Sequence, residues 1–168
     1  MRCIAESVDR IREAPPTPAL PEFVLRGFRP RDIPAVAGIV ADALHEHYDT
    51  SLYHSLSQQW PSGFLVAANR SDTPIGFLLG VTQVEGEARI LMFAVEREWR
   101  TRGVGTTLMT EFLARCRARG MRRSTLEVRL SNVPAIRFYA RFRFGVTDLL
   151  RGYYSDGENG YQMTLDLP

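Results

Sequence analysis

The sequence predicts one three-layer α/β domain whose central sheet is mixed and mostly antiparallel, flanked by about four helices. The chain has 168 residues, which is the length of one ordinary domain. Strand-like and helix-like segments are mixed without a strict alternation, so a wholly parallel sheet is not expected. Four prolines lie between Ala14 and Pro21, before the first periodic segment. We therefore expect a Pro-rich N-terminal extension over residues 1–21 and a domain over residues 22–168.

The first half of the domain is expected to form strands around two helices. Phe23–Phe28 has the length and composition of a strand, and Asp32 can cap a helix that continues to Leu44. Ser51–Trp60 is expected to form a short second helix. Three strands are then expected over Gly63–Ala68, Ile75–Val84 and Ala88–Val95, with turns at Ser71–Thr73 and Gly86–Glu87.

The second half contains the clearest periodic patterns. Apolar residues recur at helical spacing from Val104 to Cys116, and Gly120 follows where the glycine that ends a helix belongs. On this helix Cys116 is expected to be a buried apolar residue and not a nucleophile. The remaining expected elements are an alternating strand over Ser124–Leu130, a helix capped by Asn132 that continues to Phe142, and a closing hairpin of Phe144–Tyr154 and Tyr161–Leu167 with a turn at Asp156–Gly157.

The composition excludes several classes of protein. Hydrophobic residues make up 45% and charged residues 24%, as in soluble globular proteins. No apolar run approaches the ~18 residues needed to cross a membrane, so we expect a cytoplasmic protein without a signal peptide or membrane partner. The two cysteines form neither a disulfide framework nor a metal motif. All 21 basic residues are arginine, which excludes chemistry that needs a lysine of this chain.

Charge is distributed unevenly along the chain. Residues 97–143 hold twelve arginines against three glutamates, a local balance of +9, whereas the whole chain carries only +2. This pattern fits a solvated arginine face, or an anionic partner such as nucleic acid or a phosphorylated cofactor. His45, His47 and His54 cluster without a neighbouring cysteine, which is weak evidence for a metal, and we expect no metal site.

The segment Arg100–Gly105 follows an expected strand and precedes an expected helix. Glycines 103 and 105 lack Cβ atoms, so their backbone amides can approach an anion, and the helix N-terminus directs its dipole at the same point. Arg100 and Arg102 add charged donors for phosphate oxygens. A Rossmann motif would need glycine at Leu108, and a Walker A motif would need a lysine. The structural alternative is a plain glycine turn.

Three motifs in this order resemble the GNAT N-acetyltransferases, in particular the RimI-like subgroup and the archaeal N-terminal acetyltransferases. Arg100–Gly105 resembles the R/Q-x-x-G-x-G/A pyrophosphate loop, and Glu127–Tyr139 resembles the signature E-V-R-x-S-N-x-x-A-I-x-x-Y. Tyr153–Met163 resembles the tyrosine-rich hairpin of the same proteins. The resemblance covers roughly residues 22–168 and implies a GNAT-like three-layer domain that uses acetyl-CoA and no metal. The family usually has Gly-Phe where this chain has Arg143-Phe144, so the turn there is expected to differ.

The resemblance implies a catalytic pair. Glu127 corresponds to the general base, acting directly or through water, and Tyr139 to the acid that protonates the departing coenzyme A thiolate. Each has a structural alternative. Glu127 could form an ion pair with Arg129, two residues along the same strand face, and Tyr139 could be a core aromatic residue.

The resemblance also implies binding residues. The main chain of Phe93 and Val95 corresponds to the part that binds the pantetheine arm, which Asn132 would also contact. Leu44–Asp49 resembles the acceptor-side L-P-E-N-Y-P of archaeal members. For Tyr153 and Tyr154 in the closing hairpin, the alternative to acceptor binding is that they pack the hairpin against the sheet. The implied cofactor-binding residues are Phe93, Ala94, Val95, Arg100, Thr101, Arg102, Gly103, Val104, Gly105, Thr106 and Asn132. The implied acceptor-binding residues are Glu46, Tyr48, Tyr153 and Tyr154.

These inferences predict an acetyl-CoA-dependent acetyltransferase of protein N-terminal α-amines that transfers the acetyl group directly in a ternary complex. The expected partner is a protein or peptide N-terminus, with a ribosomal protein as one candidate, and no nucleic acid. The alternatives are a GNAT enzyme for small-molecule amines, a non-catalytic acyl-CoA-binding module and an arginine-rich nucleic-acid binder. A binding module needs neither Glu127 nor Tyr139. A nucleic-acid binder would interleave aromatic residues with its arginines, and Arg115–Arg123 contains none.

Overall fold

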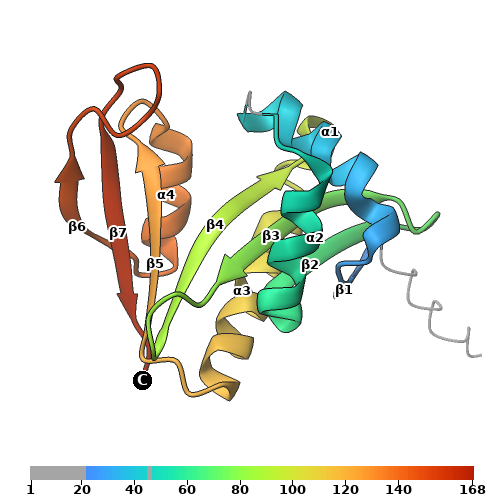
Figure 1. Ribbon diagram of the computed structural model, residues 1–168, viewed down its shortest axis with the longest axis horizontal. Helices are drawn as coiled ribbons and strands as arrows, with labels where there is room; N and C mark the ends of the chain where they lie inside the picture. Colours follow the sequence, from blue (N-terminus) through green and yellow to red (C-terminus); the bar gives the residue numbers. More distant parts are fainter. Residues whose placement is uncertain (1–21, 45–46) are drawn as a thin grey trace, which may run out of the picture.

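One mixed sheet organises the protein. The computed structural model describes residues 22–44 and 47–168, and its strands are β1 (Phe23–Gly27), β2 (Phe64–Asn69), β3 (Pro74–Val81), β4 (Glu87–Val95), β5 (Arg123–Arg129), β6 (Gly145–Leu150) and β7 (Gly160–Asp166). Their order across the sheet is β1-β2-β3-β4-β5-β7-β6 (Figure 1). The β4–β5 pair is parallel, and the other five pairs are antiparallel. This is the mostly antiparallel sheet that the sequence predicts.

Helices cover both faces of this sheet, as expected for a three-layer domain. The α-helices of the described residues are α1 (Ile33–Leu44), α2 (Thr50–Gln59), α3 (Val104–Ala118) and α4 (Val133–Arg141), and the short 3-10 turns are η1 (Pro30–Asp32), η2 (Pro61–Gly63) and η3 (Arg97–Trp99). The helices α1 and α2 contribute to one apolar cluster and α3 and α4 to the other. The helices therefore divide two and two between the faces of the sheet.

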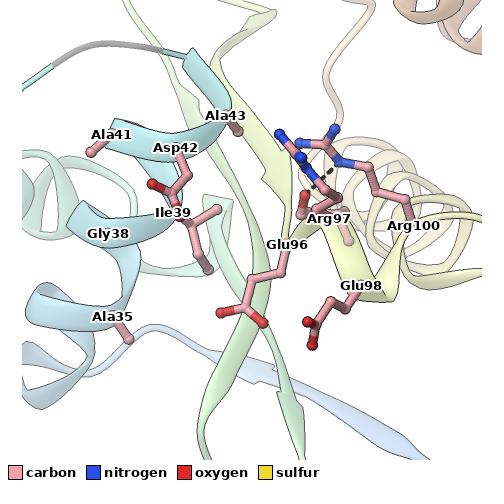
Figure 2. Close-up of a pocket in the computed structure, with 11 residues that line it drawn as sticks. Ala35, Gly38, Ile39, Ala41, Asp42, Ala43, Glu96, Arg97, Glu98 and Arg100 are labelled. Atoms are coloured by element: carbon pink, nitrogen blue, oxygen red, sulfur yellow. Dashed lines mark hydrogen bonds between the residues drawn. The ribbon is translucent and has the colours of Figure 1, made fainter.

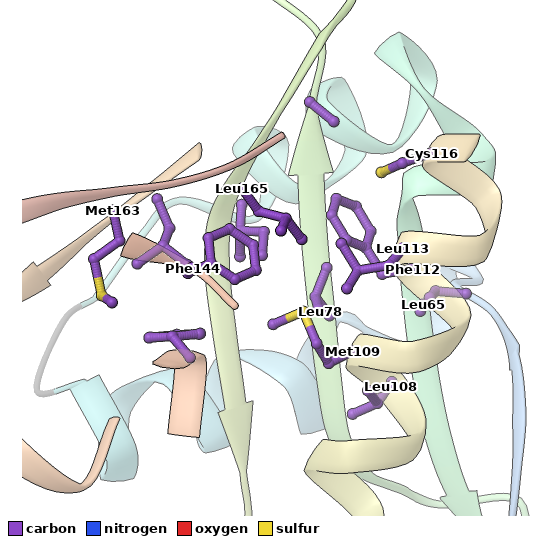
Figure 3. Close-up of a cluster of buried hydrophobic side chains, with 14 of the residues drawn as sticks. Leu65, Leu78, Leu108, Met109, Phe112, Leu113, Cys116, Phe144, Met163 and Leu165 are labelled. Atoms are coloured by element: carbon purple, nitrogen blue, oxygen red, sulfur yellow. The ribbon is translucent and has the colours of Figure 1, made fainter. Parts of the chain in front are cut away.

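Strand β3 lies at the centre of the two apolar layers. All of its residues are buried, because apolar layers cover both faces of the strand. Phe77 belongs to the layer with Val36 and Tyr53, and Leu78 belongs to the layer with Phe112. Figure 3 shows Leu78 beside the apolar side chains that α3 presents to the sheet. Cys116 is buried in the same layer, and burial raises the pKa of its thiol to about 12, in keeping with the packing role expected for it.

The parallel strands β4 and β5 pair over only part of their length. Glu87–Ile90 pairs with Arg123–Leu126, and no further pairs join these two strands. β4 nevertheless continues to Val95 and β5 to Arg129. The strands therefore diverge beyond Ile90 and Leu126, and Figure 1 shows them spreading apart toward their carboxyl ends. We call the point of divergence the fork.

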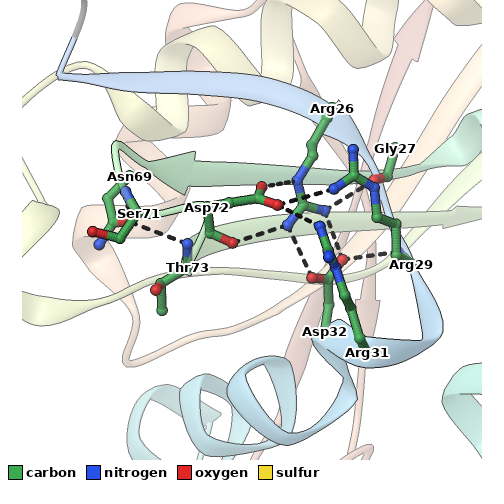
Figure 4. Close-up of polar contacts among 9 residues, drawn as sticks. All are labelled: Arg26, Gly27, Arg29, Arg31, Asp32, Asn69, Ser71, Asp72 and Thr73. Atoms are coloured by element: carbon green, nitrogen blue, oxygen red, sulfur yellow. Dashed lines mark hydrogen bonds and ion pairs between the residues drawn. The ribbon is translucent and has the colours of Figure 1, made fainter.

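The predicted capping role of Asp32 is wrong. Asp32 is buried, and its two carboxylate oxygens accept hydrogen bonds from Arg26 at 2.7 and 2.9 Å. Arg26 also donates to Asp72 at 2.6 Å, and Arg29 donates to both Asp32 and Asp72 (Figure 4). A buried carboxylate needs a charged partner, and Arg26 therefore links Asp32 of η1 to Asp72 in the turn between β2 and β3. Asp32 accepts the N–H of Arg29 in a capping box at the start of η1, and it is not the N-cap of α1.

Two helices end in the same turn with different residues. After α3, the N–H groups of Gly120 and Met121 donate to the carbonyls of Arg117 and Cys116, and Gly120 has φ of 74°. After α4, the N–H groups of Arg143 and Phe144 donate to the carbonyls of Ala140 and Tyr139, and Arg143 has φ of 70°. Both are Schellman motifs, which normally place glycine in the left-handed position. The turn at Arg143 thus keeps the backbone of a glycine turn, and the difference expected there is not found.

The closing hairpin has a longer loop than the sequence suggests. β6 ends at Leu150 and β7 begins at Gly160, so Tyr153 and Tyr154 lie in the connecting loop of residues 151–159 and not in a strand. The turn expected near Asp156–Gly157 is present, since Gly157 has φ of 83° and its N–H donates to Tyr154 at 2.8 Å.

Candidate active site

The edge of β4 beyond the fork offers free main-chain groups. The N–H of Glu96 donates to the carbonyl of Ile75 on the β3 side at 2.9 Å. Main-chain groups of a strand alternate between its two edges, so those of Phe93 and Val95 face the edge that β5 has left. The main-chain groups of Ala94, which pairs with Phe77, face β3 instead. Of these three predicted cofactor-binding residues, two thus present main-chain groups to the fork.

The carbonyl of Val95 is already occupied. It accepts a hydrogen bond from Arg100 Nε at 2.9 Å, which leaves the N–H of Val95 for a ligand. Figure 2 shows the Arg100 guanidinium beside Arg97, at the wall of a cleft of about 790 Å³ between α1 and η3. Acidic residues also line this cleft: Asp42 lies on α1, and Glu96 and Glu98 lie on either side of Arg97 in the chain. Burial raises the pKa of Glu96 there, and the nearby charges of Glu98 and Asp42 act in the same direction.

The loop that begins α3 has the left-handed backbone of an anion-binding turn. Gly103 is the N-cap of α3 with φ of 83°, and Thr101 has φ of 63°. A Cβ at Gly103 would meet no atom within 4 Å, so the backbone angle and not space requires glycine. No side chain caps α3, so N–H groups of its first turn, which contains Gly105 and Thr106, remain available to a ligand. Val104 is buried, which leaves only its main chain for binding.

Aromatic side chains support this loop. The Arg102 guanidinium lies 5.3 Å from the Trp99 ring centroid and 4.0 Å from the Glu22 carboxylate. A Cβ at Gly105 would contact Phe93 at 3.4 Å and Phe138 at 3.6 Å. Sequence reasoning did not select Phe138, which resembles an ordinary core residue of α4. In the structure its ring extends from α4 to the loop, where it lies beside Gly105 and Phe93.

Glu127 is the first residue of β5 beyond the fork. Its side chain is 12% exposed, and its Oε2 accepts hydrogen bonds from Arg89 Nε at 2.9 Å and Arg89 Nη2 at 2.8 Å. Within the described part of the chain, Oε1 has no hydrogen-bond partner. Arg129 instead binds Asp156 and Glu158, each at 2.8 Å. The ion pair of Glu127 with Arg129 is therefore not formed, and its place is taken by one with Arg89 of β4.

Both arginines hold tyrosines of the 151–159 loop. Arg89 Nη2 donates to the Tyr153 hydroxyl at 3.1 Å, and the Arg129 guanidinium lies 4.0 Å from the Tyr154 ring centroid. The two tyrosine rings contact each other edge to face, with centroids 5.2 Å apart. The predicted acceptor-side tyrosines thus stand near Glu127.

Tyr139 lies on α4 with its ring near Phe93 and Phe144, at centroid distances of 6.3 and 6.1 Å. Burial raises the pKa of its hydroxyl well above the ordinary value, and Tyr154 adds to the rise. Burial likewise raises the pKa of Tyr154 to about 12, although Arg129 acts against this rise and Glu127 adds to it. Tyr154 is therefore within electrostatic range of both predicted catalytic residues.

The remaining predicted residues lie around this centre. Asn132 caps α4, because its Oδ1 accepts the N–H of Ala135 at 3.3 Å. Tyr48 is 40% exposed in the connection between α1 and α2, and Glu46 lies outside the described residues. Among the residues that the structure describes, no group of three His, Cys, Asp or Glu side chains could hold a metal ion. No helix in this part of the chain is long and apolar enough to cross a membrane.

Comparisons with known proteins identify the family and the fold. A model of the acetyltransferase (GNAT) family matches residues 33–144. An uncharacterised N-acetyltransferase of Methanocaldococcus jannaschii is 34% identical over 152 residues, which cover 87% of this chain and 93% of that protein. An N-alpha-acetyltransferase of Saccharolobus solfataricus is 28% identical over 158 residues, which cover 87% and 94%. The crystal structure of Ard1 from Thermoplasma volcanium is 39% identical and superposes with a TM-score of 0.84 over 88% of this chain and 99% of that one.

Proposed function

Because this chain belongs to the acetyltransferase (GNAT) family, we propose that it acetylates the α-amine of protein N-termini, with acetyl-CoA as the acetyl donor. The relative named N-alpha-acetyltransferase is similar along nearly its whole length, which supports this acceptor class. The observation that carries the proposal is the position of Glu127 at the fork, beside the free edge of β4. One oxygen of this carboxylate has no hydrogen-bond partner among residues 22–44 and 47–168.

The residues around the fork fit acetyl-CoA. The N–H groups of Phe93 and Val95 would hold the pantetheine arm, and the amides from Gly103 into the first turn of α3 would hold the pyrophosphate. Arg102 would add a charged donor to the phosphate oxygens. The structural basis is the unpaired edge of β4 together with the uncapped N-terminus of α3. When bound, acetyl-CoA supplies the thioester that the acceptor amine attacks.

The catalytic residues divide the proton transfers. Glu127 takes a proton from the acceptor ammonium, directly or through water, at its unbound Oε1. Tyr139 holds its proton at neutral pH, as an ordinary phenol does, and burial disfavours its ionised form further. Its hydroxyl is therefore the group that would donate a proton to the leaving sulfur. Transfer is direct in the ternary complex. The chain has no lysine, and the thiol of Cys116 is buried with a pKa of about 12, so neither offers a nucleophile for an acetyl-enzyme.

The acceptor peptide would enter on the side of the 151–159 loop. Tyr153 and Tyr154 would line one wall, because their rings give rigid apolar area and their hydroxyls can bind peptide groups. Tyr48, in the connection between α1 and α2, would line the other wall, and the resemblance assigns Glu46, which lies outside the described residues, to the same acceptor set. Ribosomal proteins are one candidate class of acceptor, and the cytoplasmic location remains a prediction.

Mass spectrometry of a peptide library with free N-termini, incubated with the purified protein and acetyl-CoA, tests the proposed function. We expect a mass gain of one acetyl group on the α-amine for a subset of first residues, and a rate roughly 10²–10⁴-fold lower with the E127Q variant. Acetylation of small-molecule amines alone would establish the small-amine alternative. Binding of acetyl-CoA without transfer to any amine would establish the non-catalytic alternative.

A further inference from the structure

We propose that Arg89 is the positioning residue of this active site: it holds one oxygen of the Glu127 carboxylate and leaves the other free for the acceptor amine. The inference rests on the proposed function, and it concerns a residue that the sequence motifs do not include. Arg89 lies on β4, upstream of the pyrophosphate loop, and nothing in its local sequence marks it as functional.

The fork explains why this residue can reach the base. Arg89 lies opposite Thr125 in the parallel register, inside the short paired region of the two strands. Its side chain extends past the last pair to Glu127, where the strands have already separated. The ion pair therefore lies at the closed end of the space between β4 and β5. Arg89 and Glu127 are 38 residues apart in the sequence, so only the fold brings them together.

The hydrogen-bond pattern is asymmetric, and this asymmetry carries the proposal. Both Arg89 donors bind Oε2 of Glu127, at 2.9 and 2.8 Å, and none binds Oε1. An arginine that bound both oxygens side by side would occupy the whole carboxylate. Here the guanidinium restrains rotation of the carboxylate and leaves one oxygen able to accept a proton. A preorganised base of this kind costs no rearrangement when the acceptor arrives.

The same guanidinium joins the base to the acceptor side. Arg89 Nη2 also donates to the Tyr153 hydroxyl at 3.1 Å. The groups around Glu127 are thus Arg89 from β4 and two tyrosines of the 151–159 loop. Tyr153 accepts a hydrogen bond from Arg89, and the ring of Tyr154 lies next to Arg129. Loss of the Arg89 charge removes the cation hydrogen-bonded to the carboxylate.

A double-mutant cycle on turnover tests the positioning role. R89M retains the length of the side chain but removes its donors, and we expect kcat to fall by about tenfold or more, less than the loss in E127Q. The acetyl-CoA Kd should change by less than about twofold, because Arg89 contacts Glu127 and Tyr153 and not the loop that begins α3. R89K should recover part of kcat, because a lysine ammonium can donate to Oε2 although it lacks the two adjacent N–H donors of the guanidinium. In the E127Q background R89M should have no further effect.

A matched control separates this role from a general loss of charge. R123M removes an arginine of β5 that binds Asp166 at 3.3 Å and does not contact Glu127. We expect its kcat to equal that of the wild type. A kcat of R89M equal to that of R123M would overturn the proposal, as would a further fall in kcat when R89M is added to E127Q.

A cycle on thermal unfolding needs no acceptor and keeps the two proposals apart. The unfolding shifts of R89M and E127Q should not add in the double variant, because the two residues are in direct contact. If the wild type acetylates peptides and R89M does so equally well, the positioning role is wrong and the proposed function stands. If the wild type acetylates no peptide, the proposed function is wrong. In that case additive unfolding shifts would show that Arg89 and Glu127 do not interact, and non-additive shifts would show that they do.

Discussion

Gly120 and Arg143 occupy the same left-handed position in two equivalent helix-ending turns, with φ values of 74° and 70°. In both turns the hydrogen bonds are those of the Schellman motif, and at Arg143 the motif also brings Phe144 onto Tyr139. A residue with a Cβ loses roughly 1–2 kcal/mol in this conformation relative to the right-handed region. The turn after α4 therefore bears a strain that the turn after α3 does not.

Replacing Arg143 with glycine should stabilise the protein. Relief of strain exceeds the added entropy of the unfolded chain, which costs roughly 0.5–1 kcal/mol. The expected gain is about 0.5–1 kcal/mol, or a Tm rise of about 1–4 °C in thermal unfolding. G120A is the reverse control and should lower Tm, since its Cβ would meet no atom within 4 Å and only the backbone cost remains. A lower Tm for R143G would show that the arginine side chain stabilises the turn.

Substitution of Gly103 should weaken acetyl-CoA binding while the domain stays folded. G103V must leave the left-handed conformation or remain strained in it, and either change alters the amides at the start of α3. We expect Kd from calorimetry to rise by about tenfold or more. G157A is the matched control, because Gly157 has the same φ of 83° and likewise no atom within 4 Å of an added Cβ. Unchanged affinity in folded G103V would contradict a role of this loop in cofactor binding.

Removal of either predicted catalytic group should lower kcat far more than acetyl-CoA affinity. A positioned acid or base contributes roughly 10²–10⁴-fold in rate. E127Q and Y139F should each show losses in this range in steady-state kinetics, with an unchanged Kd for acetyl-CoA. Near-wild-type turnover of E127Q would mean that another group or bulk water is the base.

The loop tyrosines should affect the peptide and not the cofactor. If Tyr154 lines the acceptor site, Y154F should raise the peptide KM or change the preferred first residue, with Tm nearly unchanged. If Tyr154 only packs the loop, Y154F should lower Tm and leave KM unchanged. Steady-state kinetics over several peptides, together with thermal unfolding, separates these outcomes.

The Arg129 contacts should make a pH-dependent contribution to stability. Hydrogen bonds from Ser131 and Arg129 lower the pKa of Glu158 from 4.5 to about 2, and the pKa of Asp156 is lowered by the Glu158 N–H and Arg129. A carboxylate whose pKa is lower in the folded state stabilises that state above its unfolded pKa and loses this effect as pH falls. The Tm difference between wild type and R129M should therefore be present at neutral pH and shrink between pH 4.5 and about 2. A difference that stays constant over this range would show that Arg129 acts through its contact with Tyr154 alone.

Local sequence patterns predict the elements that local interactions determine. The helix from Val104 and its end at Gly120 follow from apolar periodicity and glycine chemistry, and both are found. The capping prediction for Asp32 fails because a pattern that suits a helix cap also suits a buried partner of Arg26, and only tertiary contacts decide between them. Local rules tell which residue types fit a position, and they do not tell which distant side chain arrives there.

The ion pair at the fork shows the same limit at the active site. The motif around Glu127 identifies the carboxylate, and the nearest arginine on its strand face is Arg129. The actual partner is Arg89, which the parallel register of β4 and β5 brings into reach. Neither composition nor periodicity determines a register between strands joined by a helix. Sequence therefore identifies the reactive group, and the fold determines what surrounds it.

The short pairing of β4 with β5 also limits the hydrogen bonds that join the two halves of the sheet, although one apolar cluster packs against both. Strands β1–β4 form one hydrogen-bonded ladder and β5, β7 and β6 another, and along the sheet only Glu87–Ile90 and Arg123–Leu126 join them. Two such units can open with different free energies, as amide hydrogen exchange resolves in other proteins. A ligand that spans the fork bonds to both units and stabilises their association by mass action. Acetyl-CoA should consequently slow exchange most at the amides of β4 and β5 next to the fork, so that the donor acts as a structural link between two halves of the sheet.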